Sequence, residues 1–247
     1  MTINSQGDLT GMRAVGRLVA DTLRVMRDAV RPGITTGELD EIAEDHAKAA
    51  GARSAPQLAY NFPGFTCISV NDEIVHGIPG PRVVAAGDVV KLDVTLELDG
   101  YIADSAITVL VPPVSPRIEA LQKCARTALN QGIAAARVGA QLREIGKAVE
   151  QEARRAGFAP IRELTGHGVG LAIHEKPEVP NFDDPSARRL LTDGLVLAVE
   201  PMLSAVPTGV VTAVDGWTLR TRGGVIAVHR EHTIVIRRGR AEILTAA

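Results

Sequence analysis

The sequence predicts an α+β fold in which two similar halves share one sheet. Two observations lead to this prediction. Helical periodicity is followed by strand-like segments twice along the chain, once in each half. Laying the second half over the first also pairs Gly33 with Gly139 and Gly51 with Gly157, as expected of a repeat. Because no segment rich in Pro, Gly or Ser separates the halves, we expect a single domain over residues 1–247.

The first half begins with two predicted helices. Apolar residues recur at helical spacing over residues 9–31 and indicate an amphipathic helix. Thr35, with Glu38 three residues later, forms a capping box that begins a second helix, and Gly51 ends it. Strand-like runs then follow at 65–70, 88–97 and 101–110.

The same order restarts in the second half. Ser115-Pro116 is a favoured helix start, because Ser caps free N–H groups and Pro fits the first turn. A further helix follows Gly139 and ends at Gly157. Strands are predicted at 195–206 and 225–237, and loops in the least regular segments, 53–64, 176–194 and 206–216.

Composition and charge argue against a protein that binds nucleic acid or membranes. With 45% hydrophobic residues and a net charge of −2, the chain has the composition of an ordinary soluble globular protein and no basic excess for nucleic acid. Its apolar runs are too short for a membrane helix, and residues 1–8 lack a signal-peptide pattern. The lone thiols of Cys67 and Cys124 suit a reducing cytoplasm better than a disulfide. We therefore expect a cytoplasmic protein that binds neither nucleic acid nor membranes.

Two aspartates occur on a predicted hairpin over residues 88–111. Asp99-Gly100 is a strong two-residue turn signal. This turn sets Asp93 and Asp104 on one face as diagonal neighbours, ~7–8 Å apart at the backbone. Two carboxylates aimed at one point repel unless a cation lies between them, and such sites suit Mn²⁺, Fe²⁺, Co²⁺ or Zn²⁺. The alternative is that both are solvated on an exposed face of the sheet.

Further candidate ligands occur in the second half. His167 sits between two glycines, where the backbone can approach a ligand closely, and His174 follows in the same apolar segment. Glu200 ends one predicted strand and Glu231 lies within another, where a carboxylate is costly unless it is paired or bound to a metal. Structural alternatives stay open: the histidines can be satisfied core residues, and Glu231 can form a structural ion pair with its neighbours Arg230 and His232.

Together these segments resemble the methionine aminopeptidases, in their bacterial type I form, over nearly the whole chain. The motifs that carry the resemblance are SVNDEIVHGIP at 69–79, KLDVT at 91–95, TGHGVG at 165–170, IHEKP at 173–177, VEPM at 199–202, and DGWT at 215–218 leading to EHT at 231–233. The resemblance implies a pita-bread fold, in which pseudo-two-fold halves form a central antiparallel sheet with flanking helices. It also implies a single catalytic metallopeptidase domain.

The same resemblance implies a metal centre. Its ligands would be Asp93, Asp104, His167, Glu200 and Glu231, holding two divalent ions that are Co, Mn, Fe or Zn. Asp104 and Glu231 would bridge the ions, Asp93 would belong to one ion, and His167 and Glu200 to the other.

The implied activity is removal of N-terminal methionine by two-metal-assisted hydrolysis, favouring a small second residue. Glu200 would shuttle the proton, His174 would donate to the developing oxyanion, and His76 would contact the scissile amide. The pocket for the first residue would be lined by Tyr60, Phe62, Cys67, Ile173 and Trp217. The implied partners are N-terminal peptides of nascent chains, at the ribosome, and we expect a monomer.

Three segments depart from the family pattern. Residues 58–65 read LAYNFPGF, and Ala103-Asp104-Ser105 stands where Gly-Asp-Thr is common. Val228-His229-Arg230 precedes Glu231, where the family usually has Ala-Gln-aromatic. A His and an Arg beside an implied ligand can alter metal affinity.

Two other functions compete with this interpretation. A proline-type aminopeptidase or dipeptidase of the same fold usually carries an extra N-terminal domain, whereas only about eight residues precede the first predicted helix here. A catalytically inactive peptide-binding module of the fold loses metal ligands, whereas the implied ligands and both histidines are present. The aminopeptidase is therefore the preferred hypothesis.

Overall fold

The computed structural model describes residues 1–246 of the 247-residue chain. The four predicted helices are present, and a fifth, short helix lies between them. The helices are α1 (Gln6–Ala29), α2 (Thr36–Ala49), α3 (Ala55–Tyr60), α4 (Pro116–Ala135) and α5 (Arg143–Arg155).

Capping residues explain where the helices begin. At α2 the predicted capping box is confirmed: the Thr35 N–H donates to Glu38 Oε2 (2.7 Å), and the Glu38 N–H donates to Thr35 Oγ1 (3.1 Å). Ser115 caps α4, also as predicted. Helix α1 begins earlier than residue 9 because Ser5 and Asp8 form a second capping box.

The strands form two larger sheets and two small ones, with antiparallel pairing throughout the described residues. In the four-stranded sheet, β4 (Val89–Leu98) pairs with β5 (Tyr101–Leu110), β2 (Cys67–Val70) and β1 (Arg53–Ser54). The five-stranded sheet has the order β15 (Glu242–Ile243), β14 (His232–Val235), β9 (Val196–Val199), β7 (Thr165–Gly168) and β8 (Glu175–Pro180). One small sheet has the order β13 (Ala227–His229), β10 (Met202–Ser204) and β6 (Ala159–Pro160). The other has the order β11 (Val210–Thr212), β12 (Leu219–Thr221) and β3 (Glu73–Val75).

The two larger sheets meet where β5 runs beside the segment that leads into β14. The Glu231 N–H donates to the Ala106 carbonyl (2.9 Å), and the Ser105 hydroxyl donates to the Glu231 carbonyl (2.7 Å). The Thr233 hydroxyl donates to the Asp104 carbonyl (2.7 Å) and accepts from the Asp104 N–H (2.9 Å). Within residues 1–246 no strand pairing joins β5 to β14, so these hydrogen bonds, which we call the seam, join the two larger sheets.

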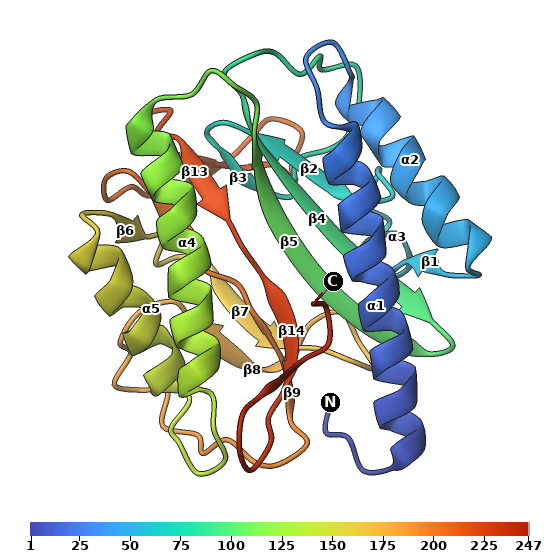
Figure 1. Ribbon diagram of the computed structural model, residues 1–247, viewed down its shortest axis with the longest axis vertical. Helices are drawn as coiled ribbons and strands as arrows, with labels where there is room; N and C mark the ends of the chain where they lie inside the picture. The colour runs from blue at the N-terminus through green and yellow to red at the C-terminus, as the bar shows by residue number, and fades with distance from the viewer. Residues whose placement is uncertain (247) are drawn as a thin grey trace.

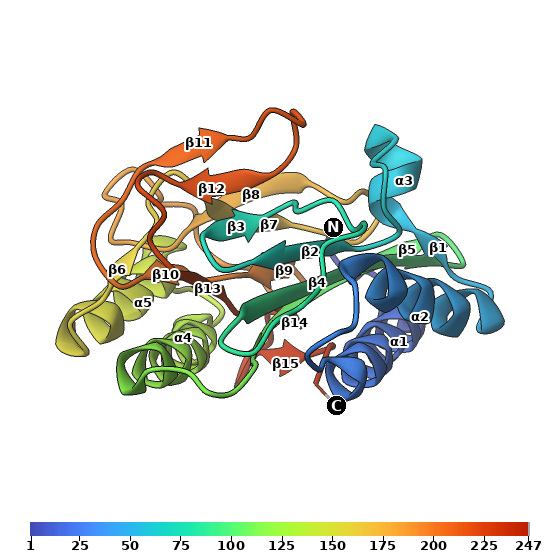
Figure 2. The same cartoon turned by 90° about the horizontal axis from the view of Figure 1, so that it is seen from above.

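The long helices cover one side of the sheets. In Figure 1, α1 and α2 lie over the first half of the chain, and α4 and α5 over the second. Figure 2 shows these four helices on one side, with α3 and the β11–β12 pair on the other. Met12 of α1 packs in one buried cluster with Leu92 of β4, and Ile145 of α5 packs in another with Leu197 of β9. Each half therefore buries apolar side chains beneath its own pair of helices.

The four glycines that the predicted repeat pairs also share a backbone conformation. Gly33 and Gly139 have φ values of 95° and 83°, and Gly51 and Gly157 have 81° and 76°. This left-handed region favours glycine because it has no Cβ. The pairing predicted from the sequence is therefore confirmed at the ends and beginnings of corresponding helices.

Three segments predicted as loops contain regular structure, so these predictions were wrong in part. Segment 53–64 holds β1 and α3, which is capped by Ser54 but is too short for helical periodicity to reveal it. Segment 176–194 holds most of β8, an edge strand that tolerates two prolines. Segment 206–216 holds β11, a short exposed strand paired with β12.

The two strands predicted in the second half are each broken in two. Residues 195–206 form β9 and β10, separated at Glu200-Pro201, and residues 225–237 form β13 and β14, separated at Arg230-Glu231. Pro201 has no N–H and cannot continue a ladder. At each break the chain passes between a small sheet and the five-stranded sheet, and a candidate ligand lies at the passage.

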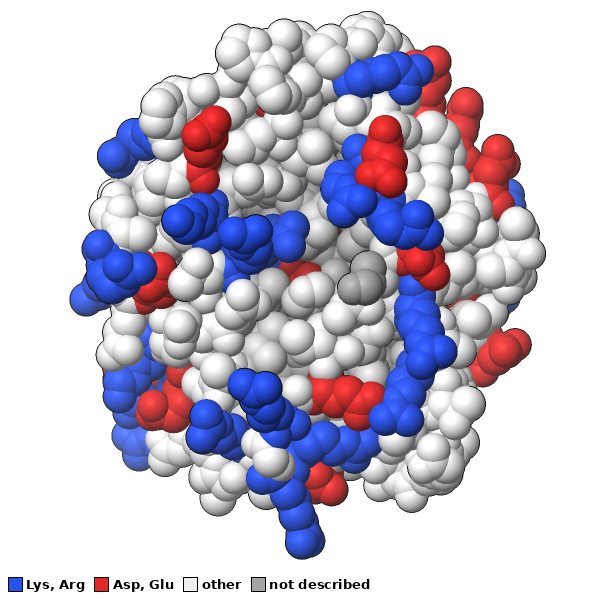
Figure 3. Space-filling model, viewed as in Figure 1, with Lys and Arg blue, Asp and Glu red and all other residues white. Residues whose placement is uncertain are grey.

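Charged side chains are mixed over the face drawn in Figure 3. Lys and Arg gather along the lower edge and the left side, with Asp and Glu among them. This distribution accords with the small net charge of −2. Among the described residues, no helix combines the length and apolar character needed to span a bilayer.

Candidate metal centre

The β4–β5 hairpin brings Asp93 and Asp104 to one face in the predicted register. Thr95 pairs with Asp104, and Asp93 pairs with Ala106, so the two carboxylates are diagonal neighbours. Asp104 is only 6% exposed, and its Oδ1 accepts a hydrogen bond from the Thr95 hydroxyl (2.8 Å). The alternative of two solvated aspartates on an exposed face was therefore wrong.

His167 of β7 faces these acids from the second half. Its Nε2 lies 3.3 Å from Glu200 Oε1 and 3.8 Å from Asp104 Oδ2. Its Nδ1 lies 2.9 Å from the Gly168 carbonyl, which can only accept, so Nδ1 carries the proton. The lone pair on Nε2 is therefore directed at the carboxylates, which is the arrangement of a histidine that binds a metal.

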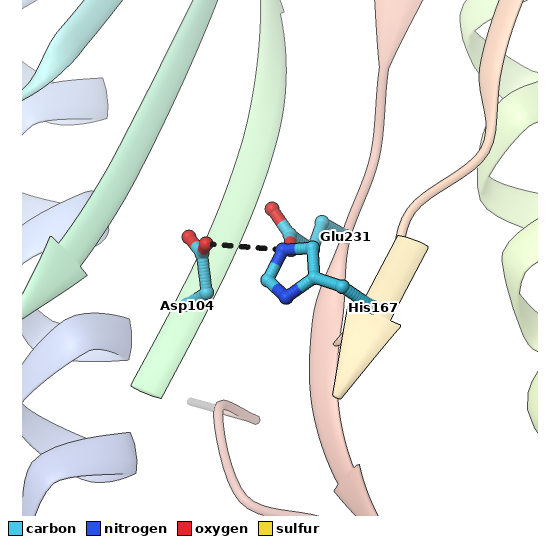
Figure 4. A group of neighbouring side chains, drawn as sticks. All are labelled: Asp104, His167 and Glu231. Carbon is cyan, nitrogen blue, oxygen red and sulfur yellow. Dashed lines mark ion pairs between the residues drawn. The ribbon is translucent and has the colours of Figure 1, made fainter. Parts of the chain in front are cut away.

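Glu231 completes the convergence. Figure 4 shows Asp104, His167 and Glu231 pointing toward one another from β5, β7 and the segment before β14. Ligand atoms of these three residues lie within 4.8 Å of one another, as do those of Glu200, His229 and Glu231. Glu231 is 2% exposed and its Oε1 has no hydrogen-bond partner among the described residues.

Burial sets the charge state of this cluster. It raises the pKa of Asp104 to about 6, and burial and neighbouring carboxylates raise the pKa of Asp93, Glu200 and Glu231 above the usual range. Burial also lowers the pKa of His167 to about 4, so the ring is neutral. Buried like charges of this kind are costly unless a cation lies among them.

Arg230 does not supply that cation. No ion pair joins it to Glu231 among the described residues, and its buried Nε has no hydrogen-bond partner there. Burial and the neighbouring charge of Arg126 lower the pKa of Arg230. The alternative of a structural ion pair between Arg230 and Glu231 was therefore wrong.

A cavity of about 320 Å³ opens onto the two aspartates. It brings together every residue predicted for substrate contact, and Pro56 and Thr95, which sequence reasoning missed. The lining residues are Pro56, Tyr60, Phe62, Cys67, His76, Asp93, Thr95, Asp104, Ile173, His174 and Trp217. Phe62 meets Trp217 edge to face with ring centroids 5.2 Å apart, which makes one wall rigid and apolar.

Two histidines stand at the mouth of the cluster. The His174 ring lies 4.3 Å from the His167 ring, centroid to centroid, and His174 Nδ1 lies 2.7 Å from the Tyr60 hydroxyl. His76 follows β3 and has a φ of 59°, and burial lowers its pKa to about 4. Both rings are therefore neutral near pH 7, since burial also lowers the pKa of His174.

His229 is the residue at the cluster that sequence reasoning did not assign. Its Nε2 lies 3.5 Å from Glu200 Oε2 and 3.8 Å from Glu231 Oε2. The available signal was its position two residues before Glu231, since alternate residues of an extended chain share a face.

Comparison with known proteins identifies the family. The model of metallopeptidase family M24 matches residues 10–238. The chain belongs to this family. Metallopeptidase chemistry and the buried His, Asp and Glu groups together fit a divalent metal site.

Relatives within family M24 extend over the whole chain. "Methionine aminopeptidase 2" of Bacillus subtilis is 39% identical over 99% of both chains. The methionine aminopeptidase of Clostridium perfringens is 38% identical over 98% of both. The crystal structure of the Thermotoga maritima methionine aminopeptidase covers 100% of both chains with a TM-score of 0.96 and 34% identity. The resemblance inferred from the motifs is confirmed.

The pita-bread fold predicted through that resemblance is confirmed by the same structure. A prolidase from Pyrococcus furiosus shares the fold, with a TM-score of 0.81. At 19% identity, and with 66% of that chain covered, it shows a common architecture alone.

Proposed function

We propose that this protein removes methionine from the N-termini of peptides and newly made proteins by metal-dependent hydrolysis. The observation that carries the proposal is the joining of a buried acid–histidine cluster to an apolar cavity of about 320 Å³. The family and the methionine aminopeptidase relatives support the same conclusion. A proline-type activity is not favoured, since the prolidase likeness concerns the fold alone.

We assign the metal ligands as follows. Two divalent ions, Co, Mn, Fe or Zn, would be held by the oxygen-rich set. Asp104 and Glu231 would bridge them, Asp93 would complete one site, and His167 and Glu200 the other. Divalent ions in such a site lower the pKa of a bound water and polarise the substrate carbonyl.

The surrounding side chains then handle protons and charge. Glu200 takes the proton of the attacking water and passes it to the leaving amine. His174 Nδ1 lies 2.7 Å from the Tyr60 hydroxyl, and we assign the hydroxyl as the donor, which places the His174 proton on Nε2. That N–H donates to the developing oxyanion, and His76 contacts the scissile amide.

Specificity follows from the cavity wall. Phe62, Cys67 and Ile173 are buried, and Trp217 packs against Phe62, so the wall suits an unbranched apolar side chain such as methionine. A small second residue is favoured because His76 crowds the next position.

The remaining features of the proposal concern the protein in the cell. Residues 1–247 act as one catalytic domain and as a monomer, on N-terminal peptides of nascent chains at the ribosome. A cytoplasmic location is supported by Cys67 and Cys124, which are both free and buried.

Peptide hydrolysis by metal-stripped protein tests the function. After reconstitution with Co²⁺, Mn²⁺, Fe²⁺ or Zn²⁺, the protein should release methionine from Met-Ala-Ser faster than the first residue from Leu- or Pro-initiated peptides. Glu200→Ala and Asp104→Ala should lose turnover by roughly a thousandfold or more while the circular dichroism spectrum stays unchanged. Glu178→Ala, at an exposed acid of β8, is the matched control and should keep full activity. Faster release of leucine or proline, or activity retained in either ligand variant, contradicts the proposal.

A further inference from the structure

His229 stands at the end of β13 with its ring turned into the metal cluster. Its side chain is 1% exposed, and its Nε2 faces Glu200 Oε2 at 3.5 Å and Glu231 Oε2 at 3.8 Å. His167 approaches the other oxygen of Glu200, Oε1, at 3.3 Å. One carboxylate therefore has a different histidine at each oxygen.

The backbone that carries the His229 ring is fixed by hydrogen bonds to Thr108 and by strand pairing. The His229 N–H donates to the Thr108 hydroxyl (2.9 Å), and that hydroxyl donates to the His229 carbonyl (2.8 Å). Strand β13 also pairs His229 with Met202 of β10. The backbone at His229 is therefore anchored on both sides, and the buried ring starts from a fixed point.

The second ring nitrogen distinguishes His229 from His167. In His167, Nδ1 lies 2.9 Å from the Gly168 carbonyl, so Nδ1 holds the proton and Nε2 is free to bind a cation. In His229 both ring nitrogens are buried and neither has a hydrogen-bond partner among residues 1–246, but Nε2 has carboxylate oxygens of Glu200 and Glu231 at 3.5 and 3.8 Å. A buried N–H without an acceptor is costly, and an unused lone pair is the lesser loss. The proton of His229 therefore belongs on Nε2, between two carboxylates.

We propose that His229 is a positioning residue that donates its Nε2–H to Glu200 Oε2, and secondarily to Glu231 Oε2, and so fixes the ligand oxygens for the metal. The inference rests on the proposed metal centre and adds to it a role for a residue outside the five assigned ligands. A donor at Oε2 orients the Glu200 carboxylate and leaves Oε1 directed at the ion beside His167. The competing arrangement is direct binding of the metal by His229. It needs an unprotonated Nε2, which would leave the proton on Nδ1 without an acceptor.

Long-range ¹H–¹⁵N NMR of the full-length, ¹⁵N-histidine-labelled protein loaded with Zn²⁺ reads the two tautomers directly. We expect the proton on Nε2 in His229 and on Nδ1 in His167, with the His229 signal assigned by its loss in His229→Gln. A His229 ring protonated at Nδ1 overturns the proposal and assigns the residue as a ligand.

Two substitutions test the consequence for metal binding. In His229→Gln the amide nitrogen can occupy the place of Nε2, so Co²⁺ affinity, measured calorimetrically, should stay within about threefold of the parent. In His229→Leu the donor is lost, and Co²⁺ affinity should fall roughly 10- to 100-fold with an altered visible spectrum of bound Co²⁺. Equal losses in both variants, or no loss in His229→Leu, contradict the positioning role.

These measurements separate the inference from the proposed function. Tautomer and Co²⁺ affinity are read without any peptide, so a wrong substrate assignment leaves both results unchanged. Conversely, methionine release by a protein whose His229 carries its proton on Nδ1 upholds the function and rejects the positioning role. Circular dichroism of the two variants tests whether they fold, and the NMR experiment uses His229→Gln only to assign the His229 signal.

Discussion

At the scale of single residues, Asp104 holds the most constrained charge of the site. Its Oδ1 accepts a hydrogen bond from the Thr95 hydroxyl, and its Oδ2 lies 3.8 Å from His167 Nε2. Burial raises its pKa to about 6. Burial and neighbouring carboxylates raise the pKa of Glu200 and Glu231 as well. The metal-free cluster therefore takes up protons as the pH falls toward 6, and a binding cation has to displace them.

Metal affinity should consequently fall as the pH is lowered. His167, with its pKa lowered to about 4, stays neutral and adds no competing proton above that pH, so the carboxyl groups set the sign. We expect Co²⁺ affinity to weaken by roughly tenfold or more between about pH 7.5 and 5.5, with proton release in calorimetry. Asp104→Asn should release fewer protons per ion. An affinity that is level over this range contradicts the assignment.

Tyr60 is predicted to act through His174. Tyr60→Phe removes the donor that holds the His174 proton on Nε2, so kcat should fall about tenfold with little change in KM. Steady-state kinetics on Met-Ala-Ser measures both constants. The matched control is Tyr101→Phe, which removes the other tyrosine hydroxyl of the chain, bonded to Asp8 at 3.0 Å. A loss confined to KM would assign Tyr60 to binding alone.

At the scale of elements, the hydroxyl of Thr233 connects β14 to β5. Thr233→Val keeps the shape but leaves the buried Asp104 N–H without an acceptor, and should lower the free energy of unfolding by about 2 kcal/mol. Chemical denaturation measures the loss, and Co²⁺ titration should show weaker binding. Thr233→Ser retains the hydroxyl and should recover most of both quantities. If Thr233→Val and Thr233→Ser have equal free energies of unfolding and equal Co²⁺ affinities, the Thr233 hydroxyl contributes to neither.

Local signals were sufficient for the β4–β5 hairpin and for the helix starts. The Asp99-Gly100 turn and the side-chain period of two fixed the register that joins Thr95 to Asp104. The Thr35–Glu38 capping box likewise needs only four consecutive residues. Such features could be predicted because the interactions that form them lie close together in the sequence.

Features that depend on distant contacts could not be predicted in this way. At Glu200 and Glu231 the chain changes sheets; Pro201 is a local signal for the first break, but no local pattern records the second. His229 had only its position two residues before Glu231 as a signal, because its contact with Glu200 joins segments that are distant in sequence. The ligand roles of His167, Glu200 and Glu231 came from family resemblance, since either structural or functional histidines and acids fit their local sequence.

At the scale of the whole molecule, metal removal should destabilise both halves together. The candidate ligands come from β4 and β5 in one half and from the second-half strands in the other. A metal ion present at about 100 times its Kd raises the free energy of unfolding by about 2.7 kcal/mol. For a chain of this size, that increase raises Tm by about 5–10 °C. Calorimetry with Co²⁺ and with a chelator measures the shift. Asp104→Asn should show a much smaller Co²⁺-dependent shift of Tm. A shift equal to that of the parent protein would mean that Co²⁺ binds at another site.

The seam described above also governs when the site can form during folding. Asp104 and Thr233 are 129 residues apart in sequence, and Ser105 and Glu231 are 126 apart, so their hydrogen bonds are among the most non-local in the chain. Contacts of this kind close only after each half has formed its local structure. The β4–β5 hairpin, with its two aspartates, can therefore fold before any histidine reaches it. Assembly of the complete cluster becomes a late step, and a partly folded chain offers a metal ion only a fraction of its ligands.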